Sequence, residues 1–391
     1  MIEGKESRSG GAALRYGMVG GGAGSFIGDV HRKAIAFDGT ATLVAGCFSQ
    51  NFENTLATGK GLGLDSGRLY RSFDEMAERE AAREDPIDFA VIVTPNYAHY
   101  SAAKAFLSRG IHVVCDKPLT FTVAEAEELG QLARERGLLF GVTYTYSGYP
   151  LVKQAREMIR RGDLGTIRVV MAEYPQDWLA TPAERGTNKQ AAWRTDPQYT
   201  GVSNCTGDIG SHVEHTVSYI TGLRIQSLCA NLQTFVAERV LDDNSEVLVR
   251  YTNGASGIYW SSQVAVGHDN GLKVRVFGSE GSLEWEQENP NFLKVARLGQ
   301  PVQILARGGG YLYPEAARLG RIPAGHPEGY YEAFANIYAA FGNALAKQKA
   351  GATLSEADLD FPTVEAGIAG VKFINRCVES SQQGAVWVRL D

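Results

Sequence analysis

The fold is decided by residues 14–24, LRYGMVGGGAG, in which a short apolar run passes directly into a glycine-rich loop. Gly28 follows at the point where a helix is expected to begin. Only residues without a Cβ atom let a chain turn this tightly and let a ligand come close to the helix N-terminus. Free N–H groups and the helix dipole favour an anion there. The stretch predicts a loop that holds the pyrophosphate of a dinucleotide, with an ordinary glycine-rich turn as the alternative for the motif taken alone.

Four more apolar runs follow the glycine loop and predict a parallel sheet. These runs lie at 42–48, 89–94, 112–115 and 138–143. Segments with helical spacing separate them, and Thr122 with Glu125 opens one such segment in a capping-box pattern. Strands that alternate with helices form βαβ units, whose sheet is buried on both faces. Residues 14–148 are therefore expected to form a Rossmann dinucleotide-binding domain.

The pattern changes after about residue 149, where apolar and polar residues alternate between glycine-containing turns. Such segments are typical of strands in an open sheet, and they lie at 167–174, 227–236, 246–251, 257–262 and 272–277. Helical spacing returns at 333–346 and 363–380. We expect an α/β protein in which an α+β substrate-binding and oligomerisation domain, 149–391, carries an open, mostly antiparallel sheet. The polar residues 1–13 are expected to be a flexible leader, and the C-terminal helices could pack back on the first domain.

Composition excludes several classes of function. The 391 residues are 44% hydrophobic and 21% charged, which is ordinary for a chain with two globular cores. A net charge of −6 offers no basic surface for nucleic acid or anionic lipid. No apolar run approaches the roughly 18 to 20 residues that span a bilayer. The five cysteines are scattered without C-x-x-C spacing, so neither a disulfide framework nor a zinc site is indicated, and a cytoplasmic location fits best.

The glycine spacing leaves the identity of the dinucleotide open. If Gly20 and Gly22 are the first two glycines of the fingerprint, Gly28 is the third only with about three inserted residues, which implies a longer phosphate loop. The second predicted strand ends in Ser49-Gln50-Asn51, without the carboxylate that usually holds the adenosine ribose. Ser49 could accept either a hydroxyl or a phosphate. The cofactor is therefore expected to be NAD(H) or NADP(H), with a slight preference for NAD.

Three short motifs together resemble the glucose-fructose oxidoreductase, inositol dehydrogenase and MocA family, called Gfo/Idh/MocA. Thr94-Pro95-Asn96 with His99 follows one predicted strand, Asp116-Lys117-Pro118 follows the next, and Gly207-Asp208-Ile209-Gly210-Ser211-His212 lies in the second domain. Their order and spacing agree with the family, and the resemblance covers essentially everything after about residue 14.

The resemblance implies a nicotinamide between the two domains and hydride transfer to or from a secondary alcohol of a sugar, glycoside or inositol. Lys117 is the counterpart of the family's lysine beside the nicotinamide, with Asp116 in place of the usual glutamate. Lys117, Asp208 and His212 resemble the catalytic set. The expected cofactor contacts are Gly20, Gly22, Gly24, Ser25, Phe26, Ile27, Ser49, Thr94, Pro95, Asn96, His99, Asp116 and Lys117.

The same residues suit acid–base chemistry on physical grounds. Asp208 and His212 are four positions apart, so they share one face if Asp208 opens a helix. Oxidation of an alcohol needs a base for the hydroxyl proton, and we expect Lys117 and His212 to share this role while Asp208 orients them. Which of the two takes the proton is left open. The alternatives are an exposed loop lysine, a structural histidine, and a metal site that includes His215.

Aromatic and polar residues could line a sugar site, because pyranose faces stack on rings and hydroxyls need fixed partners. The expected substrate contacts are Lys117, Tyr146, Tyr149, Trp178, Trp193, Arg194, Asp208, His212 and His326. Trp193 and Arg194 are the stronger candidates because they precede the Asp208 motif. No metal is expected.

Competing functions remain at this stage. One alternative is an enzyme that keeps NAD(H) tightly bound and recycles it between an alcohol and a ketone. The other is a catalytically silent sensor protein that binds a dinucleotide. A sugar nucleotide substrate would need a basic cluster for its diphosphate, and none is evident near Asp208. An open sheet would expose apolar surface in a monomer, so we expect a homo-oligomer, a dimer or a tetramer.

Overall fold

The computed structural model describes residues 14–390, so the predicted leader 1–13 lies outside the described residues. The N-terminal half contains a five-stranded parallel sheet in the order β2-β1-β3-β4-β5, as the apolar runs predicted. Its strands are β1 (Leu14–Gly20), β2 (Ala41–Cys47), β3 (Phe89–Val93), β4 (His112–Cys115) and β5 (Phe140–Val142). The strands are almost continuously apolar because helices cover both faces of the sheet.

Helices connect these parallel strands. They are α1 (Phe26–Phe37), α2 (Phe52–Gly61), α3 (Phe73–Ala81), α4 (His99–Leu107) and α5 (Val123–Glu135). The predicted capping box at the start of α5 is present, with Thr122 and Glu125 each accepting from the other's backbone N–H. The helix N-termini and the carboxyl ends of the strands meet at one edge of the sheet, which is where the glycine loop lies.

The second half contains a nine-stranded sheet with the strand order β13-β12-β11-β10-β6-β9-β8-β7-β14. Only the β6–β9 pair is parallel, so the sheet is mostly antiparallel, as predicted. Its strands are β6 (Ile167–Pro175), β7 (Ile225–Gln233), β8 (Asn244–Tyr251), β9 (Ser256–Ser262), β10 (Lys273–Gly278), β11 (Gly281–Glu286), β12 (Phe292–Arg297), β13 (Gln303–Ala306) and β14 (Val388–Arg389). Residues along β8 alternate between buried and exposed, because helices cover only one face.

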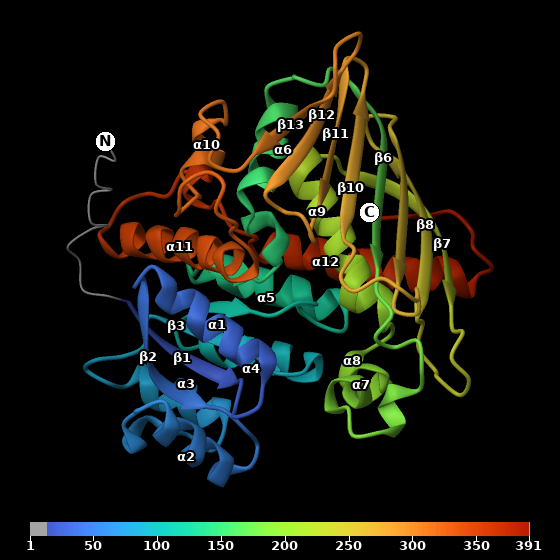
Figure 1. Cartoon of the computed structure of the whole chain (residues 1–391). Coiled ribbons are helices and arrows are strands. Elements are labelled where there is room, and N and C mark those ends of the chain that lie inside the picture. Colours follow the sequence, from blue (N-terminus) through green and yellow to red (C-terminus); the bar gives the residue numbers. More distant parts are fainter. Residues whose placement is uncertain (1–13, 391) are drawn as a thin grey trace.

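The remaining helices are α6 (Pro150–Arg160), α7 (Lys189–Arg194), α8 (Pro197–Thr200), α9 (Ser211–Thr221), α10 (Pro314–Ala317), α11 (Tyr330–Lys349) and α12 (Val364–Gln382). Of these helices, α6, α9 and α12 pack on this sheet, and α11 packs on the N-terminal half. Figure 1 shows the parallel sheet and the large sheet on opposite sides of the molecule, with α11 and α12 running between them. No helix within residues 14–390 has the length and apolar character needed to cross a membrane.

Helix α11 completes the core of the N-terminal half, although it lies about 190 positions further along the chain than β5. The ring of Phe341 is fully buried, and its centroid lies 5.3 Å from those of Phe89 and Phe361. His31 of α1 shares a 2.6 Å hydrogen bond with the Tyr338 hydroxyl. The C-terminal helices therefore do pack back on the first half, and its core is built from both ends of the chain.

Replacing Phe341 by alanine should lower the free energy of unfolding by about 3–5 kcal/mol, because a buried aromatic ring is lost and a cavity remains. Denaturant unfolding of the whole protein measures this. The control is Phe235→Ala, whose side chain is 64% exposed and should change stability by less than about 0.5 kcal/mol. Equal stability of the two variants would show that α11 is not part of this core.

Candidate active site

A cavity of about 790 Å³ lies between the two halves, at the edge where the parallel strands end. We call it the main cavity. Its walls come from the glycine loop and the start of α1, from the segments after β3 and β4, and from α7, α9 and the loops of the large sheet. The volume is in the range of small-molecule sites. All three residues of the predicted catalytic set, Lys117, Asp208 and His212, line the main cavity.

The glycine loop fits an incoming pyrophosphate. Gly20 and Gly21 adopt positive φ angles of 80° and 71°, which side chains rarely tolerate. Gly28, in the first turn of α1, packs on Gly21 so closely that a Cβ atom would lie 2.4 Å from the Gly21 Cα atom. The hydroxyl of Ser25 caps α1 by accepting from the Gly28 N–H at 3.2 Å. The loop thus presents bare backbone at the N-terminus of a 12-residue helix, which is what an anion needs.

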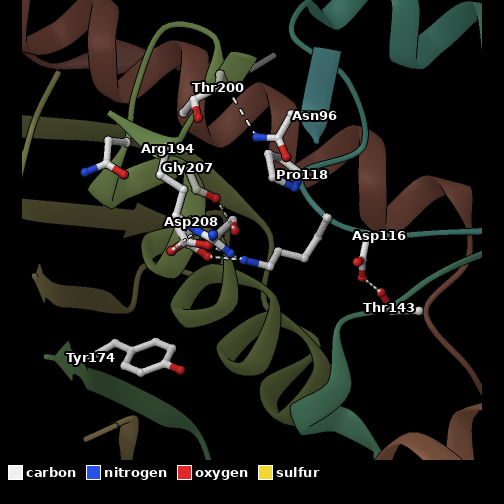
Figure 2. A network of polar contacts seen from close by, with 12 residues as sticks. Asn96, Asp116, Pro118, Thr143, Tyr174, Arg194, Thr200, Gly207 and Asp208 are labelled. Atoms are coloured by element: carbon white, nitrogen blue, oxygen red, sulfur yellow. Dashed lines mark hydrogen bonds and ion pairs between the residues drawn. The ribbon is translucent and has the colours of Figure 1, made fainter. Parts of the chain in front are cut away.

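His99 holds two walls of the main cavity together without lining it. Its ring lies between two backbone carbonyl oxygens, 2.9 Å from that of Thr94 and 2.9 Å from that of Pro118. The side chain is fully buried, and burial lowers the pKa of His99. Asn96 does line the cavity, and its Nδ2 donates to the Thr200 carbonyl oxygen at 3.4 Å (Figure 2). This bond connects the parallel sheet to the segment that carries α8.

The carboxylate of Asp116 turns into the N-terminal half. It accepts a hydrogen bond from the Thr143 hydroxyl (Figure 2), and its Oδ1 lies 3.4 Å from His31 Nε2. Burial opposes ionisation of Asp116, but the influence of His31 and the Thr143 hydrogen bond outweigh it and hold its pKa at about 2. Asp116 is therefore a partly buried, ionised carboxylate in the lining of the main cavity, directly before Lys117.

Lys117 reaches from the end of β4 into the second half of the protein. Its ammonium donates to Asp208 twice, to the Oδ1 atom at 2.7 Å and to the backbone carbonyl oxygen at 2.6 Å. The other carboxylate oxygen of Asp208 accepts from Gln263 at 3.1 Å and lies 3.3 Å from the Arg194 Nε atom. Burial opposes ionisation of Asp208, but the charges of Lys117 and Arg194 hold its pKa well below the usual range. The group is therefore a charged, multiply bonded carboxylate.

Asp208 lies within a π-helical turn, Thr206–Gly210, and not at the opening of an α-helix as the spacing suggested. The helix begins earlier because the buried carboxylate of Asp242 accepts from the N–H groups of Asn204 and Thr206, both at 2.8 Å. Helix α9 continues directly from the π turn and carries His212 in its first turn. Both side chains still line the same cavity.

His212 is held by aromatic rings. Its ring centroid lies 4.8 Å from that of Tyr146, 5.7 Å from Tyr144 and 6.2 Å from Tyr174. The Nδ1 atom is buried without a hydrogen-bond partner, and the residue lines the main cavity. Burial, and next the charge of Lys117, lower the pKa of His212 well below its usual value. The imidazole is therefore neutral at neutral pH and able to accept a proton.

His215 lies behind this set and does not line the main cavity. Its ring stacks on Tyr144 with 4.3 Å between centroids, and burial lowers its pKa to about 3. The geometry contradicts the alternative in which His215 joins Asp208 and His212 around a metal. Within residues 14–390, no group of three or more His, Cys, Asp or Glu side chains is arranged to hold an ion.

The predicted aromatic wall is present in large part. Arg194 lies over the Trp193 ring at 4.3 Å and over the Trp178 ring at 5.8 Å, and all three line the main cavity. Tyr146 lines it as well and hydrogen-bonds the hydroxyl of Tyr174. This wall combines ring faces with a cation held in place, and its Arg194 lies on the side of Asp208 away from Asp116 (Figure 2).

The structure divides the predicted site residues into two groups. Those that line the main cavity are Gly20, Ser25, Phe26, Ile27, Thr94, Pro95, Asn96, Asp116, Lys117, Tyr146, Trp178, Trp193, Arg194, Asp208 and His212. Those outside its lining are Gly22, Gly24, Ser49, His99, Tyr149 and His326. Ser49 instead accepts from the Asn51 N–H at 3.1 Å, and Tyr149 and His326 line a neighbouring cavity.

Several lining residues were not predicted from the sequence. They are Gly21, Tyr174, Gln176, Asn270, Gln287 and Tyr330, among others. Tyr174 and Gln176 flank Pro175 in the same short stretch as Trp178. Their nearness to this predicted residue is the sequence signal that could have identified them. Asn270, Gln287 and Tyr330 belong to loops and a helix end far along the chain, and no local pattern marks them.

Family models match both parts of the chain. A family model described as an oxidoreductase family with an NAD-binding Rossmann fold matches residues 14–144, and a GFO/IDH/MocA C-terminal domain model matches residues 152–284. An uncharacterized oxidoreductase of Bacillus subtilis, YfiI, is 40% identical over 379 residues, which cover 96% of each chain.

Solved structures show the same similarity. An inositol dehydrogenase homologue from Azotobacter vinelandii, solved with NAD+, is 42% identical with a TM-score of 0.93, covering 96% of this chain and 97% of that one. A second structure of an inositol dehydrogenase homologue from that organism contains NADH and myo-inositol, with 40% identity, a TM-score of 0.90 and the same coverage. With both halves matched by family models and with relatives of this similarity, the chain belongs to the Gfo/Idh/MocA family of NAD-binding oxidoreductases.

Proposed function

We propose that this protein is a dehydrogenase that transfers hydride between NAD(H) and a secondary alcohol of a sugar, glycoside or inositol. The observation that carries the proposal is the convergence of Lys117, Asp208 and His212 on the cavity that also contains the glycine loop. Ligands reported for relatives support the substrate class. The A. vinelandii homologue was solved with myo-inositol, and a levoglucosan dehydrogenase from Pseudarthrobacter phenanthrenivorans is 26% identical over 72% of this chain.

NAD(H) is proposed in preference to NADP(H). The two A. vinelandii structures contain NAD+ and NADH, and they match this chain at 40% identity or more. A relative whose name specifies NADP+, an inositol dehydrogenase of B. subtilis, is only 26% identical and matches 53% of this chain. The dinucleotide would lie along the glycine loop, Thr94 and Asn96, with Asp116 and Lys117 next to its nicotinamide.

Each catalytic group has a separate part in the proposed reaction. When bound, the dinucleotide supplies the hydride acceptor or donor. The ammonium of Lys117, fixed by Asp208, donates a hydrogen bond to the reacting oxygen and stabilises negative charge on it. The neutral His212 accepts the hydroxyl proton through Nε2 during oxidation and returns it during reduction. Trp178, Trp193 and Arg194 orient the ring of the substrate.

Lys117→Ala and His212→Ala should each lower kcat by about 10²- to 10⁴-fold, the usual contribution of a positioned acid or base, while NADH binding is retained. Formation of NADH from a panel of sugars and inositols measures turnover. The control is Lys104→Ala, because this lysine lies on α4 and pairs with Glu128 outside the cavity. Wild-type turnover in both active-site variants would refute the assignment. A wild-type protein that binds NADH but oxidises nothing in the panel would favour a silent sensor.

Gly28→Ala should weaken NADH binding roughly tenfold or more, equivalent to at least about 1.4 kcal/mol, because the new Cβ atom would displace the phosphate loop at Gly21. Titration of NADH fluorescence measures the affinity. Gly61→Ala is the matched control: this glycine lies in α2 with nothing within 4 Å of the new Cβ position. Unchanged affinity in Gly28→Ala would show that the phosphates bind elsewhere.

The outer face of the large sheet is proposed to form a homo-oligomer interface. Leu248 of β8 pairs with Ile258 of β9, which pairs with Met171 of β6, so these side chains form one row across three strands. Leu248 and Ile258 are 48% and 44% exposed in the single chain. Val169 and Phe277, a pair on the neighbouring row, are also exposed. Apolar rows of this kind are usually covered in the functional assembly.

Light scattering should therefore give the wild-type protein the mass of a dimer or tetramer, and Ile258→Lys should reduce it to the monomer mass, because a charge would be buried without a partner. Leu62→Lys, at the end of α2 in the first half, is the control and should leave the mass unchanged. A monomeric wild-type protein at micromolar concentration would contradict the proposed interface.

A further inference from the structure

A second cavity of about 770 Å³ adjoins the main cavity, and we call it the side cavity. It lies beside β11 and β12, against the segment that leads into α11. Asn270, Gln287 and Tyr330 belong to the walls of both cavities. These three residues therefore form a shared boundary between the two cavities.

Two side chains that line the side cavity, Gln287 at the boundary and Glu328 beyond it, each have a polar atom without a hydrogen-bond partner among the described residues. The Oε1 atom of Gln287 is buried without a hydrogen bond. Glu328 is 4% exposed and its Oε2 atom is also unpartnered, although its Oε1 accepts from Arg307 and from two backbone N–H groups. Buried acceptors without partners are rare because they lose hydrogen bonds to water. Because both side chains line the side cavity, hydroxyl groups of a ligand that contacts them could supply the missing hydrogen bonds.

The side cavity also offers apolar ring surface. Phe292 lines it and is 46% exposed, so its ring supplies this surface, whereas Tyr149, which also lines it, is 2% exposed. Aromatic faces next to amide and carboxylate acceptors are suited to a pyranose ring, which has apolar C–H faces and a rim of hydroxyl groups. Tyr149 and His326 are the two predicted substrate residues that do not line the main cavity, and both line the side cavity.

The charges in the side cavity disfavour a phosphorylated ligand. Its arginine, Arg307, is 3% exposed and is used internally: it donates to Asn291 and Glu328, both at 3.0 Å, and to backbone carbonyl oxygens. Glu288 and Glu328 add carboxylates to the lining. A diphosphate would meet these carboxylates without a free guanidinium to bind it.

We propose that the side cavity is a second sugar subsite, so that the protein acts on a neutral glycoside whose reacting ring occupies the main cavity and whose second ring occupies the side cavity. This inference rests on the proposed dehydrogenase function and narrows its substrate class. The ring that is oxidised stacks in the Trp178, Trp193 and Arg194 wall. The attached ring extends past Gln287 toward Phe292 and His326 and supplies hydroxyl donors to the unpartnered acceptors.

The test compares rings with and without a second sugar. Calorimetry on the NADH-loaded protein measures binding of cellobiose and maltose against glucose, and of galactinol against myo-inositol. At least one glycosylated compound should bind about tenfold or more tightly than its parent ring. Equal binding of the parent rings and all their glycosylated forms would overturn the subsite.

Phe292→Ala and Asn289→Ala, two changes at exposed positions of the side cavity, should remove this gain and leave binding of the parent ring unchanged. Phe235→Ala, an exposed phenylalanine outside both cavities, should keep the full gain. If the gain persists in both side-cavity variants, the second ring does not bind there.

The outcomes also separate this inference from the proposed function. Binding and oxidation of parent rings without any gain from a second sugar would overturn the subsite alone. Absence of binding and of turnover for every compound, with NADH still bound, would overturn the dehydrogenase proposal as well.

Discussion

The ion pair between Lys117 and Asp208 is the interaction on which the site depends. It joins residues 91 positions apart, one at the end of a strand in the parallel sheet and the other in the π turn before α9. The lysine donates to the side chain and to the backbone of the same residue, so its position is fixed in two directions. This contact aligns the glycine loop of one half with the aromatic wall of the other, and the main cavity lies between them.

Burial gives the neighbouring groups different protonation states. Asp208 stays ionised because Lys117 and Arg194 outweigh the cost of burial, whereas burial and the charge of Lys117 outweigh the attraction of Asp208 and lower the pKa of His212. A fixed positive charge and a neutral base therefore face the same space. This pairing suits an alcohol that must lose a proton and a hydride together, because one group stabilises the developing negative charge while the other removes the proton.

Sequence reasoning was most successful where the chemistry is local. The glycine loop could be predicted from its local pattern, whereas Thr94, Lys117 and the Asp208–His212 motif were recognised through short motifs that resemble the family. The π turn could not be predicted, because Asp242 from a distant loop determines where the helix starts. The role of α11 in the first core, and the entry of Asn270 and Tyr330 into the site, also depend on tertiary packing that no local pattern encodes. Tyr149 and His326 were expected to contact the substrate beside the catalytic set, and the structure places them instead around the side cavity.

The most direct test of the central claim is a crystal structure of the protein with NADH and a cyclic polyol that it binds. The account predicts one secondary hydroxyl within hydrogen-bonding distance of both the Lys117 ammonium and the His212 imidazole, with the carbon that bears this hydroxyl facing the nicotinamide. A polyol bound with no hydroxyl near either group, or a nicotinamide ring outside the main cavity, would contradict it.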